Sequence, residues 1–345
     1  MSHKVTIQIV TWNSLLVMPH CLHSIFEQTY KDFQVLVIDN NSQDNTVDFI
    51  RKNYPEVAVL HNNKNHGFAR ANNQGLMLLK SPYVVLCNPD IVLEPDWLEK
   101  TMAVAEDEKY KVYGGFGGKL LKLKLLVGDG GEVEKTTTID SCGLKILKNH
   151  RVVEIGSGEP SENFVNQQEI FGHSGALALY KREALENCII KNSDHNVGDY
   201  FDGDFFFYKE DVDLAWRLQL LGWKSLFLPE VTAFHLRTMS GSDKIQAWQI
   251  IANRRQQSRL AKYYSYRNHF LVLLGNEFWS NLLFLSPYIF WYELKKFIFI
   301  LLFETSNLKA IGEVLRLLPR TLRKRKLIMG RAKVDATYFR DYWLK

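Results

Sequence analysis

Several patterns that mark common nucleotide-binding and secreted proteins are missing from this sequence. No Gly-x-Gly-x-x-Gly motif follows the first predicted strand, and no Gly-x-x-x-x-Gly-Lys-Ser/Thr motif occurs, which disfavours a dinucleotide fold and excludes a P-loop NTPase. The four cysteines are widely spaced, so they suggest neither a metal site nor a disulfide framework but reduced, mostly buried thiols of a cytoplasmic protein. The first residues do not form a signal segment, and neither an internal repeat nor a low-complexity tract is present.

Charge is unevenly distributed along the chain. The 345 residues carry a net charge of +5, yet residues 254–333 hold 16 Lys and Arg against four Glu. That segment is therefore +12 and the remainder of the chain is −7. A mildly acidic body with a strongly basic C-terminal segment predicts a polyanionic partner for that segment alone.

Predicted strands alternate with predicted helices over the first hundred residues. The strands are the short apolar runs Val5–Val10, Phe33–Ile38, Val57–Leu60 and Tyr83–Cys87. Such alternation is typical of an α/β protein with a mostly parallel sheet flanked by helices. In sheets of this kind, ligands bind beyond the carboxyl ends of the strands.

Three of these strands end on polar residues. The clusters are Thr11–Asn13, Asp39–Ser42 and Asn88–Asp90. Each cluster alone is ordinary turn chemistry, but three of them at one edge of a sheet predict a binding site. A nucleotide can bind there without a glycine-rich loop if Asp39 accepts from the base or ribose and Asp90 holds Mg²⁺ or Mn²⁺ on the phosphates.

The stretch Phe201–Trp223 combines aromatic, acidic and helical patterns. Apolar residues at spacings of three and four predict a helix whose opening turn holds Glu210, Asp211 and Asp213, and Arg217 can pair with Asp213. The stretch fits a capped helix with solvated acids. It also fits a general base at the floor of a pocket, where Phe205–Phe207 exclude water and raise a carboxylate pKa.

The middle of the chain is less regular. We expect an insertion near the pocket mouth over about residues 120–168, including a hairpin formed by Ile139–Leu147 and Arg151–Ile155. His173–Ala176 allows close approach of a ligand but equally fits a plain tight turn. Two short strands are expected on either side of Pro229, and His235 at the end of the second fits either a structural histidine or a metal ligand opposite Asp90.

The C-terminal hundred residues are basic and rich in aromatic side chains. The apolar run Leu282–Phe303 includes Lys295 and Lys296, which argue against a helix that spans a membrane. A pair of helices lying in the membrane interface fits better than buried core helices. Arg316–Arg331 suits an anionic lipid surface. A nucleic-acid partner is disfavoured because the basic residues alternate with Leu and Ile and no nucleic-acid motif is present.

Seven segments, in order, resemble the family 2 glycosyltransferases, which have the GT-A (Rossmann-like) fold, and above all their rhamnosyltransferase branch. They are VTWN (10–13), VIDNNSQD (37–44), NHGFARANNQG (65–75), LCNPD (86–90), HSGALALYKREAL (173–185), FFFYKEDVDLAWRLQLLGW (205–223) and HLRTMSG (235–241). The resemblance covers about residues 5–240. It departs from the common Asp-x-Asp motif, which reads Asn88-Pro89-Asp90 here and so lacks one carboxylate.

The resemblance implies a role for each matching residue. Asp211 is the expected catalytic base, paired with Glu210, and Asp90 and His235 are the expected ligands of a divalent cation. The residues expected to bind substrate are Thr11, Asn13, Asp39, Asn41, Gly67, Phe68, Asn73, Asn88, His173, Gly175, Ala176 and Arg217, the last by contact with the diphosphate or by orienting the acids.

The implied protein is a metal-dependent, inverting glycosyltransferase with a catalytic domain over 1–240 and an interfacial helical segment over 241–345. It is expected to move a sugar, L-rhamnose from dTDP-rhamnose in the first instance, onto a hydroxyl of a saccharide or polyprenyl-linked saccharide in cell-surface polysaccharide synthesis. It would act at the inner face of the cell membrane. Another nucleotide sugar, or an inactive homologue that only binds one, remains an alternative.

Overall fold

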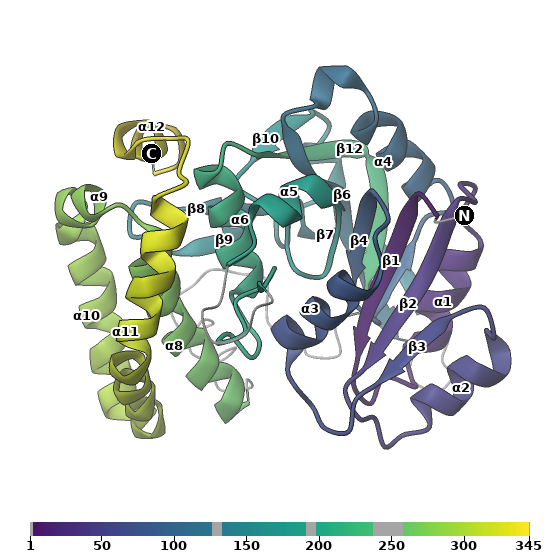
Figure 1. Cartoon of the computed structure of the whole chain (residues 1–345), viewed down its shortest axis with the longest axis horizontal. Coiled ribbons are helices and arrows are strands. Elements are labelled where there is room, and N and C mark those ends of the chain that lie inside the picture. Colours follow the sequence, from purple (N-terminus) through teal and green to yellow (C-terminus); the bar gives the residue numbers. More distant parts are fainter. Residues whose placement is uncertain (1–2, 126–132, 191–197, 237–257, 345) are drawn as a thin grey trace.

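A computed structural model describes residues 3–125, 133–190, 198–236 and 258–344 (Figure 1). Within these residues, ten strands form one mixed sheet in the order β10-β12-β6-β11-β4-β1-β2-β3, with β5 and β7 attached to β12 and β6. The strands of the first half are β1 (Val5–Thr11), β2 (Phe33–Asp39), β3 (Ala58–His61) and β4 (Tyr83–Cys87). They are parallel, as predicted, and their polar ends meet at one edge.

The second half of the sheet differs from the mostly parallel sheet that we predicted. Its strands are β5 (Ile91–Leu93), β6 (Tyr113–Leu125), β7 (Val133–Ser141), β10 (Gln168–Ile170), β11 (Leu177–Lys181) and β12 (Lys224–His235). Strand β11 lies antiparallel to both β4 and β6, whereas β12 is parallel to β6. The residues around Pro229 therefore do not separate two strands. They form an irregularity within β12, because proline cannot donate to the sheet at that point.

Helices cover both faces of the sheet (Figure 1). They are α1 (Met18–Phe26), α2 (Thr46–Asn53), α3 (Phe68–Leu78), α4 (Trp97–Ala105), α5 (Arg182–Asn187) and α6 (Glu210–Leu220), with short 3-10 turns at Glu108–Tyr110 and Ser161–Asn163. One hydrophobic cluster fills the space between β1, α1 and α4, and all four cysteines are free and buried. The predicted helix after the aromatic stretch is thus confirmed as α6.

The excursion between β6 and β11 includes the predicted hairpin, formed by β8 (Leu144–Ile146) and β9 (Val152–Glu154). His150, next to its turn, stacks on Trp216 of α6 and contacts Glu277. The hairpin is therefore attached to α6, while β7 extends the main sheet by pairing with β6.

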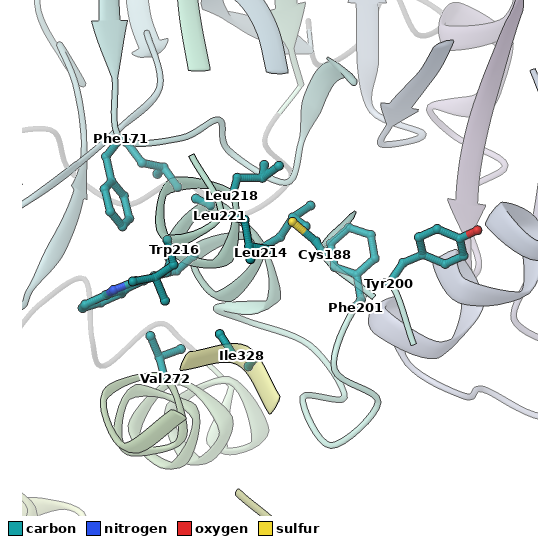
Figure 2. Close-up of a cluster of buried hydrophobic side chains, with 14 of the residues drawn as sticks. Phe171, Cys188, Tyr200, Phe201, Leu214, Trp216, Leu218, Leu221, Val272 and Ile328 are labelled. Carbon is teal, nitrogen blue, oxygen red and sulfur yellow. The ribbon is translucent and has the colours of Figure 1, made fainter. Parts of the chain in front are cut away.

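Within residues 258–344 there are five helices: α8 (Arg259–Asn276), α9 (Trp279–Phe284), α10 (Ser286–Phe303), α11 (Lys309–Met329) and α12 (Ala336–Trp343), with a 3-10 turn at Thr305–Leu308. Figure 2 shows Val272 of α8 and Ile328 of α11 facing Leu214 and Trp216 of α6, within one buried cluster. The C-terminal helices therefore share a core with α6. The boundary that we predicted near residue 240 lies outside the described residues.

None of the helices within the described residues has the length and apolar character needed to cross a membrane.

Candidate active site

The polar ends of β1 and β2 form one tightly bonded corner. The carboxylate of Asp39 is fully buried and accepts from the Ser42 backbone N–H (3.0 Å) and hydroxyl, and it lies 2.8 Å from Nδ1 of His61. The Asn40 N–H donates to the Thr11 carbonyl at 2.8 Å, and the Thr11 hydroxyl is buried without a partner among the described residues. Asp39 and Thr11 are thus brought together as predicted.

Asn13 and Asn41 shape the loops beside this corner. Both adopt left-handed backbone conformations, with φ of 51° and 67°, which asparagine tolerates better than most residues. The Asn13 side chain accepts from the Gln43 N–H at 2.7 Å, so it holds the loop after β2 against the loop after β1. The loops are ordered by their own side chains and leave Trp12 56% exposed, an aromatic surface that the sequence analysis did not select.

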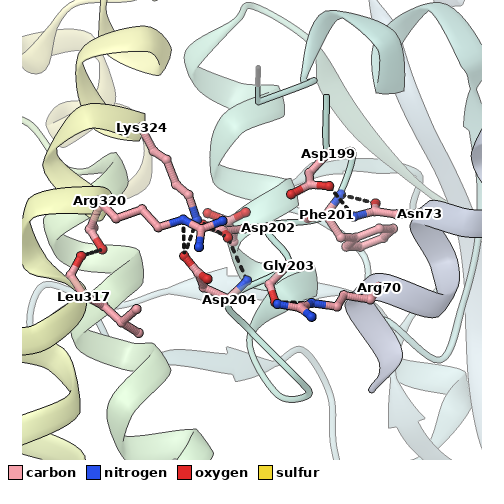
Figure 3. Close-up of polar contacts among 12 residues, drawn as sticks. Arg70, Asn73, Asp199, Phe201, Asp202, Gly203, Asp204, Leu317, Arg320 and Lys324 are labelled. Atoms are coloured by element: carbon pink, nitrogen blue, oxygen red, sulfur yellow. Dashed lines mark hydrogen bonds and ion pairs between the residues drawn. The ribbon is translucent and has the colours of Figure 1, made fainter. Parts of the chain in front are cut away.

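Gly67 opens α3 at a close contact with the aromatic stretch. Its φ is +82°, and a Cβ there would lie 2.4 Å from the Phe206 carbonyl oxygen, so this position requires glycine. The next residue, Phe68, donates its N–H to that same carbonyl at 2.7 Å. Asn73 lies further along α3 and binds both the N–H and the carbonyl of Phe201 (Figure 3). Asn73 therefore fixes the loop before α6, and its polar atoms are committed to that backbone.

Asp90 and His235 meet at the ends of β4 and β12. His235 Nε2 lies 3.3 Å from Asp90 Oδ2, and the other ring nitrogen, Nδ1, lies 2.8 Å from Asp140 Oδ2. Burial lowers the pKa of His235, but the hydrogen bonds to Asp140 and Asp90 outweigh burial and raise this pKa to about 9. Asp90 Oδ1 is buried without a partner among the described residues, which leaves one acceptor oxygen in this corner unused.

Within the described ranges, no three His, Cys, Asp or Glu side chains are grouped so that all of them could hold one metal ion. The donor set is therefore two side chains, Asp90 and His235, with Asp140 behind the histidine. An imidazole nitrogen and a carboxylate with a spare oxygen are ligands that Mn²⁺ and Mg²⁺ accept, so the residues fit a divalent cation whose other ligands come from elsewhere.

Glu210 and Asp211 begin α6 directly after two strained residues. Tyr208 and Lys209 both have φ close to +68°, a conformation that costs non-glycine residues energy and that clusters at functional sites. Burial, followed by the neighbouring charge of Asp211, raises the pKa of Glu210 to about 8. Burial also raises the pKa of Asp211. Both acids are thus buried with raised pKa values, as a general base in a dry pocket requires, and the role of Phe205–Phe207 in excluding water stays a prediction.

The loop after β10 connects the acids to the strand ends. The Gly175 N–H donates to Asp211 Oδ2 at 3.0 Å, and the Asn88 N–H donates to the Ala176 carbonyl at 2.8 Å. A Cβ on Gly175 would lie 3.3 Å from Cβ of Asp211, so the small residue permits this approach. Gly175 and Ala176 therefore place the Asp211 carboxylate beside the Asn88–Asp90 turn.

The side chains of His173 and Arg217 are both buried in the protein interior. His173 is buried against Gly117, and burial lowers its pKa to about 4. Arg217 is fully buried and donates to Asp213, to the Cys188 carbonyl and to the Tyr200 carbonyl. The diphosphate contact expected of Arg217 does not fit this geometry, because its donors are used inside the core. The pairing of Arg217 with Asp213 is confirmed.

Three residues with contacts near the candidate site escaped the sequence analysis. Asp140 contacts His235 across 95 positions of sequence, and Lys324 and Arg320 of α11 pair with Asp202 and Asp204 in the loop before α6 (Figure 3). No local pattern marks these pairs, because each joins segments that are adjacent only in the folded chain. The feature of the sequence that could have suggested these ion pairs is its charge distribution, since the acidic run Asp199–Asp204 is matched by an unusually basic C-terminal segment.

Comparison with known proteins shows the family and the fold of this chain. The profile described as "Glycosyl transferase family 2" matches residues 6–189, more than half of the chain. A curated relative, glycosyltransferase GlyG of Streptococcus pneumoniae, is 26% identical over 102 residues, which are 29% of this chain and 34% of that protein. The N-acetylglucosaminyl-diphospho-decaprenol L-rhamnosyltransferase of Mycobacterium tuberculosis is 23% identical over 240 residues, covering 64% of this chain and 71% of the relative.

Among solved structures, GalNAc-T7 with UDP, GalNAc and Mn²⁺ superposes with a TM-score of 0.61 at 13% sequence identity, covering 99% of this chain and 56% of that one. This similarity shows the fold, which is GT-A. The chain belongs to glycosyl transferase family 2, has the GT-A fold, and is similar to the L-rhamnosyltransferase of Mycobacterium tuberculosis. It spans only about a third of the length of GlyG. The expectation drawn from the seven sequence segments is confirmed to that extent.

Proposed function

We propose that this protein transfers a sugar from a nucleoside diphosphate to a saccharide hydroxyl in a single inverting displacement. The observation that carries the proposal is the position of Asp211. The Gly175 N–H fixes its carboxylate, and the same loop holds the Asn88–Asp90 turn through Ala176. A carboxylate that lacks a hydrogen-bonded cation and has a raised pKa thus lies beside a candidate site for the diphosphate.

In the proposed reaction, Asp211 accepts the proton of the acceptor hydroxyl. The hydroxyl oxygen forms a bond to the anomeric carbon from one face of the sugar. The bond between that carbon and the β-phosphate oxygen breaks on the other face, and the electron pair leaves with the nucleoside diphosphate. A positioned base of this kind contributes about 10²–10⁴-fold in rate. Glu210, whose pKa is raised to about 8, keeps its proton at neutral pH and therefore adds no second negative charge.

Asp90 and His235 would hold a divalent cation, Mn²⁺ or Mg²⁺, in this proposal. When bound, the cation offsets negative charge on the departing diphosphate. The fit rests on the unpartnered Oδ1 of Asp90, the Nε2 of His235 facing it, and the absence of a competing Lys or Arg among the contacts described for Asp90. Asp39, Thr11 and Asn13 would line the nucleoside site, and Asn88 would contact the ribose.

We propose L-rhamnose from dTDP-rhamnose as the first donor to test and a polyprenyl-linked saccharide as the acceptor, for synthesis of a cell-surface polysaccharide. The support is the similarity, over 64% of this chain, to a relative named as an L-rhamnosyltransferase acting on a diphospho-decaprenol saccharide. UDP-hexoses and UDP-N-acetylhexosamines are the alternative donors, as the UDP in the similar GalNAc-T7 structure indicates.

We further propose that the enzyme binds peripherally to the inner face of the membrane through α9 and α10. These helices lie on the side of the molecule farthest from β1–β3 (Figure 1) and expose large apolar side chains. The exposed set is Trp279, Leu283, Phe284, Tyr288, Phe290, Trp291, Phe297, Ile298, Leu301, Leu302 and Phe303. An interfacial helix carries such side chains on one face and cations nearby. Arg316, Arg323 and Lys326 of α11 are exposed and supply the cations.

A thermal-shift screen tests the donor and the metal together. The purified protein is mixed with dTDP-rhamnose, UDP-glucose, UDP-galactose, UDP-N-acetylglucosamine or GDP-mannose, each with Mn²⁺, Mg²⁺ or EDTA. A ligand at 100 times its dissociation constant stabilises the fold by about 2.7 kcal/mol. We expect a metal-dependent shift with one donor that Asp90→Ala abolishes. A shift that is equal in EDTA would contradict the metal site, and no shift with any donor would contradict the proposed activity.

A further inference from the structure

Asp140 lies directly behind the proposed metal ligand His235. Its Oδ2 is 2.8 Å from His235 Nδ1, while Nε2 on the opposite side of the ring is 3.3 Å from Asp90 Oδ2. Asp140 is 1% exposed and His235 is 8% exposed, so this pair is shielded from water, whereas Asp90 is partly exposed. Nδ1 therefore donates to Asp140, and Nε2 is the nitrogen directed at the Asp90 corner.

A β-bulge places Asp140 in this position. Ser141 of β7 pairs with Leu120 of β6, but Ile139 pairs with the next residue, Leu121, so β7 carries one residue more than its partner at Asp140. Bulges are frequent beside active sites, where they redirect one side chain. Strand β6 also pairs with β12, where Lys122 lies opposite His235, so the bulge and the histidine occur at the same level of the sheet.

We propose that Asp140 is a positioning residue that orients His235 as a metal ligand, a proposal that rests on the cation site proposed above. A histidine that ligates a metal through one nitrogen commonly donates its other N–H to a carboxylate, which fixes the ring and strengthens the nitrogen as a ligand. Asp140 occupies that place. The excursion that the sequence predicted as a variable insertion thus contributes to the chemistry of the site.

Binding of Mn²⁺ in the presence of UDP or dTDP tests this inference without measuring turnover. Free Mn²⁺ is followed by electron paramagnetic resonance for the wild type, Asp140→Asn and Glu154→Gln. The last is a matched control, because Glu154 is a carboxylate of the same excursion and contacts the neighbouring Ser141. Loss of such a carboxylate behind a ligand typically weakens metal binding about 10–100-fold. We expect this loss in Asp140→Asn and unchanged affinity in Glu154→Gln.

A double-mutant comparison separates positioning from general stability. In a His235→Ala background, Asp140→Asn should not weaken Mn²⁺ binding further, because the residue through which it acts is gone. If Asp140→Asn does not fold, histidine-selective ¹⁵N NMR of the wild type loaded with Mg²⁺ should show His235 protonated at Nδ1 and not at Nε2.

Three results would overturn the inference, and they differ in what they mean for the proposed function. Wild-type Mn²⁺ affinity in Asp140→Asn would leave the metal site in place and remove the positioning role of Asp140. A loaded His235 ring that is protonated at Nε2 would show that this nitrogen does not bind the metal. A wild type that binds no Mn²⁺ with either nucleotide would instead remove the metal site itself, and the inference with it.

Discussion

Two pairs of acidic residues lie within ten positions of each other, and they differ in whether a cation forms an ion pair with them. Asp202 and Asp204 both contact the ammonium of Lys324, and Arg320 lies 3.1 Å from Asp204 (Figure 3). Glu210 and Asp211 have no cation within hydrogen-bonding distance among the described residues. Burial affects both pairs, but among the described residues only the first pair forms an ion pair, whereas the charge of Lys209 acts on Asp211 without a hydrogen bond.

The pKa values express this difference. Burial alone would raise the pKa of Asp202, yet Lys324 holds that pKa below its ordinary value. Burial raises the pKa of Glu210 to about 8, and it also raises the pKa of Asp211 because it outweighs the opposing charge of Lys209. A neutralised pair holds two segments together, whereas a pair left without a cation can exchange a proton with a substrate. We therefore propose an architectural role for the first pair and a catalytic role for the second.

The largest expected effect is on turnover, in Asp211→Asn. The amide keeps the shape of the side chain but cannot act as a base for the hydroxyl of the acceptor saccharide. We therefore expect kcat to fall about 10²–10⁴-fold. Donor binding, measured by thermal shift, should change little because the proposed nucleoside contacts lie at the ends of β1 and β2. Glu210→Gln is the paired variant and should retain most of its turnover. The reverse pattern, with Asp211→Asn active and Glu210→Gln inactive, would move the base by one residue.

A large effect on stability is expected in Lys324→Met. This change leaves Asp202 and Asp204 without their shared ammonium, and removing one partner of a buried pair typically destabilises a protein by about 3–5 kcal/mol. Urea unfolding measures the loss. Lys326→Met is the matched control, because Lys326 is exposed on the same helix and its substitution should change stability by less than about 0.5 kcal/mol. Equal stability of the two variants would contradict the architectural role of the first pair.

A smaller effect that depends on pH is expected from Glu210. The unfolded chain loses this proton near its ordinary pKa of 4.5, whereas the folded protein holds it up to about 8. Unfolding therefore releases a proton between these values, and the contribution of Glu210 to stability falls as pH rises through that window. Glu210→Gln, which cannot ionise, should gain stability relative to the wild type from about pH 5 to 8. A constant difference in urea midpoint would show that Glu210 is ionised in the folded protein.

The parts that the sequence predicted correctly depend on local patterns. Continuous apolar runs predicted β1, β2 and β4. The polar clusters at the ends of these strands predicted the positions of Thr11, Asp39 and Asp90 at one edge of the sheet. Helix α6 followed from residues at spacings of three and four. These features are set by which side chains are buried, and that information lies within about ten neighbouring residues.

The parts that the sequence did not predict depend on long-range pairing. These features are the antiparallel half of the sheet, the continuity of β12 through Pro229, the bulge at Asp140 and the partners of Lys324. They join segments from about 20 to more than 100 residues apart. Arg217 shows the same limit, because its spacing from Asp213 predicted the pair but not its complete burial. The basic composition of residues 316–331 likewise did not reveal that Lys324 and Arg325 face inward.

The smallest expected effect distinguishes the outward-facing cations of α11 from the inward-facing Lys324. Arg323 and Lys326 are exposed, and each basic residue near an anionic membrane contributes about 1 kcal/mol of binding. Arg323→Gln and Lys326→Gln should each weaken binding to vesicles containing anionic lipid about fivefold, as measured by flotation. Lys52→Gln, an exposed change on α2 at the far side of the molecule, is the control and should have no effect. Equal losses from all three variants would mean that vesicles respond to net charge, and not to a face formed by the C-terminal helices.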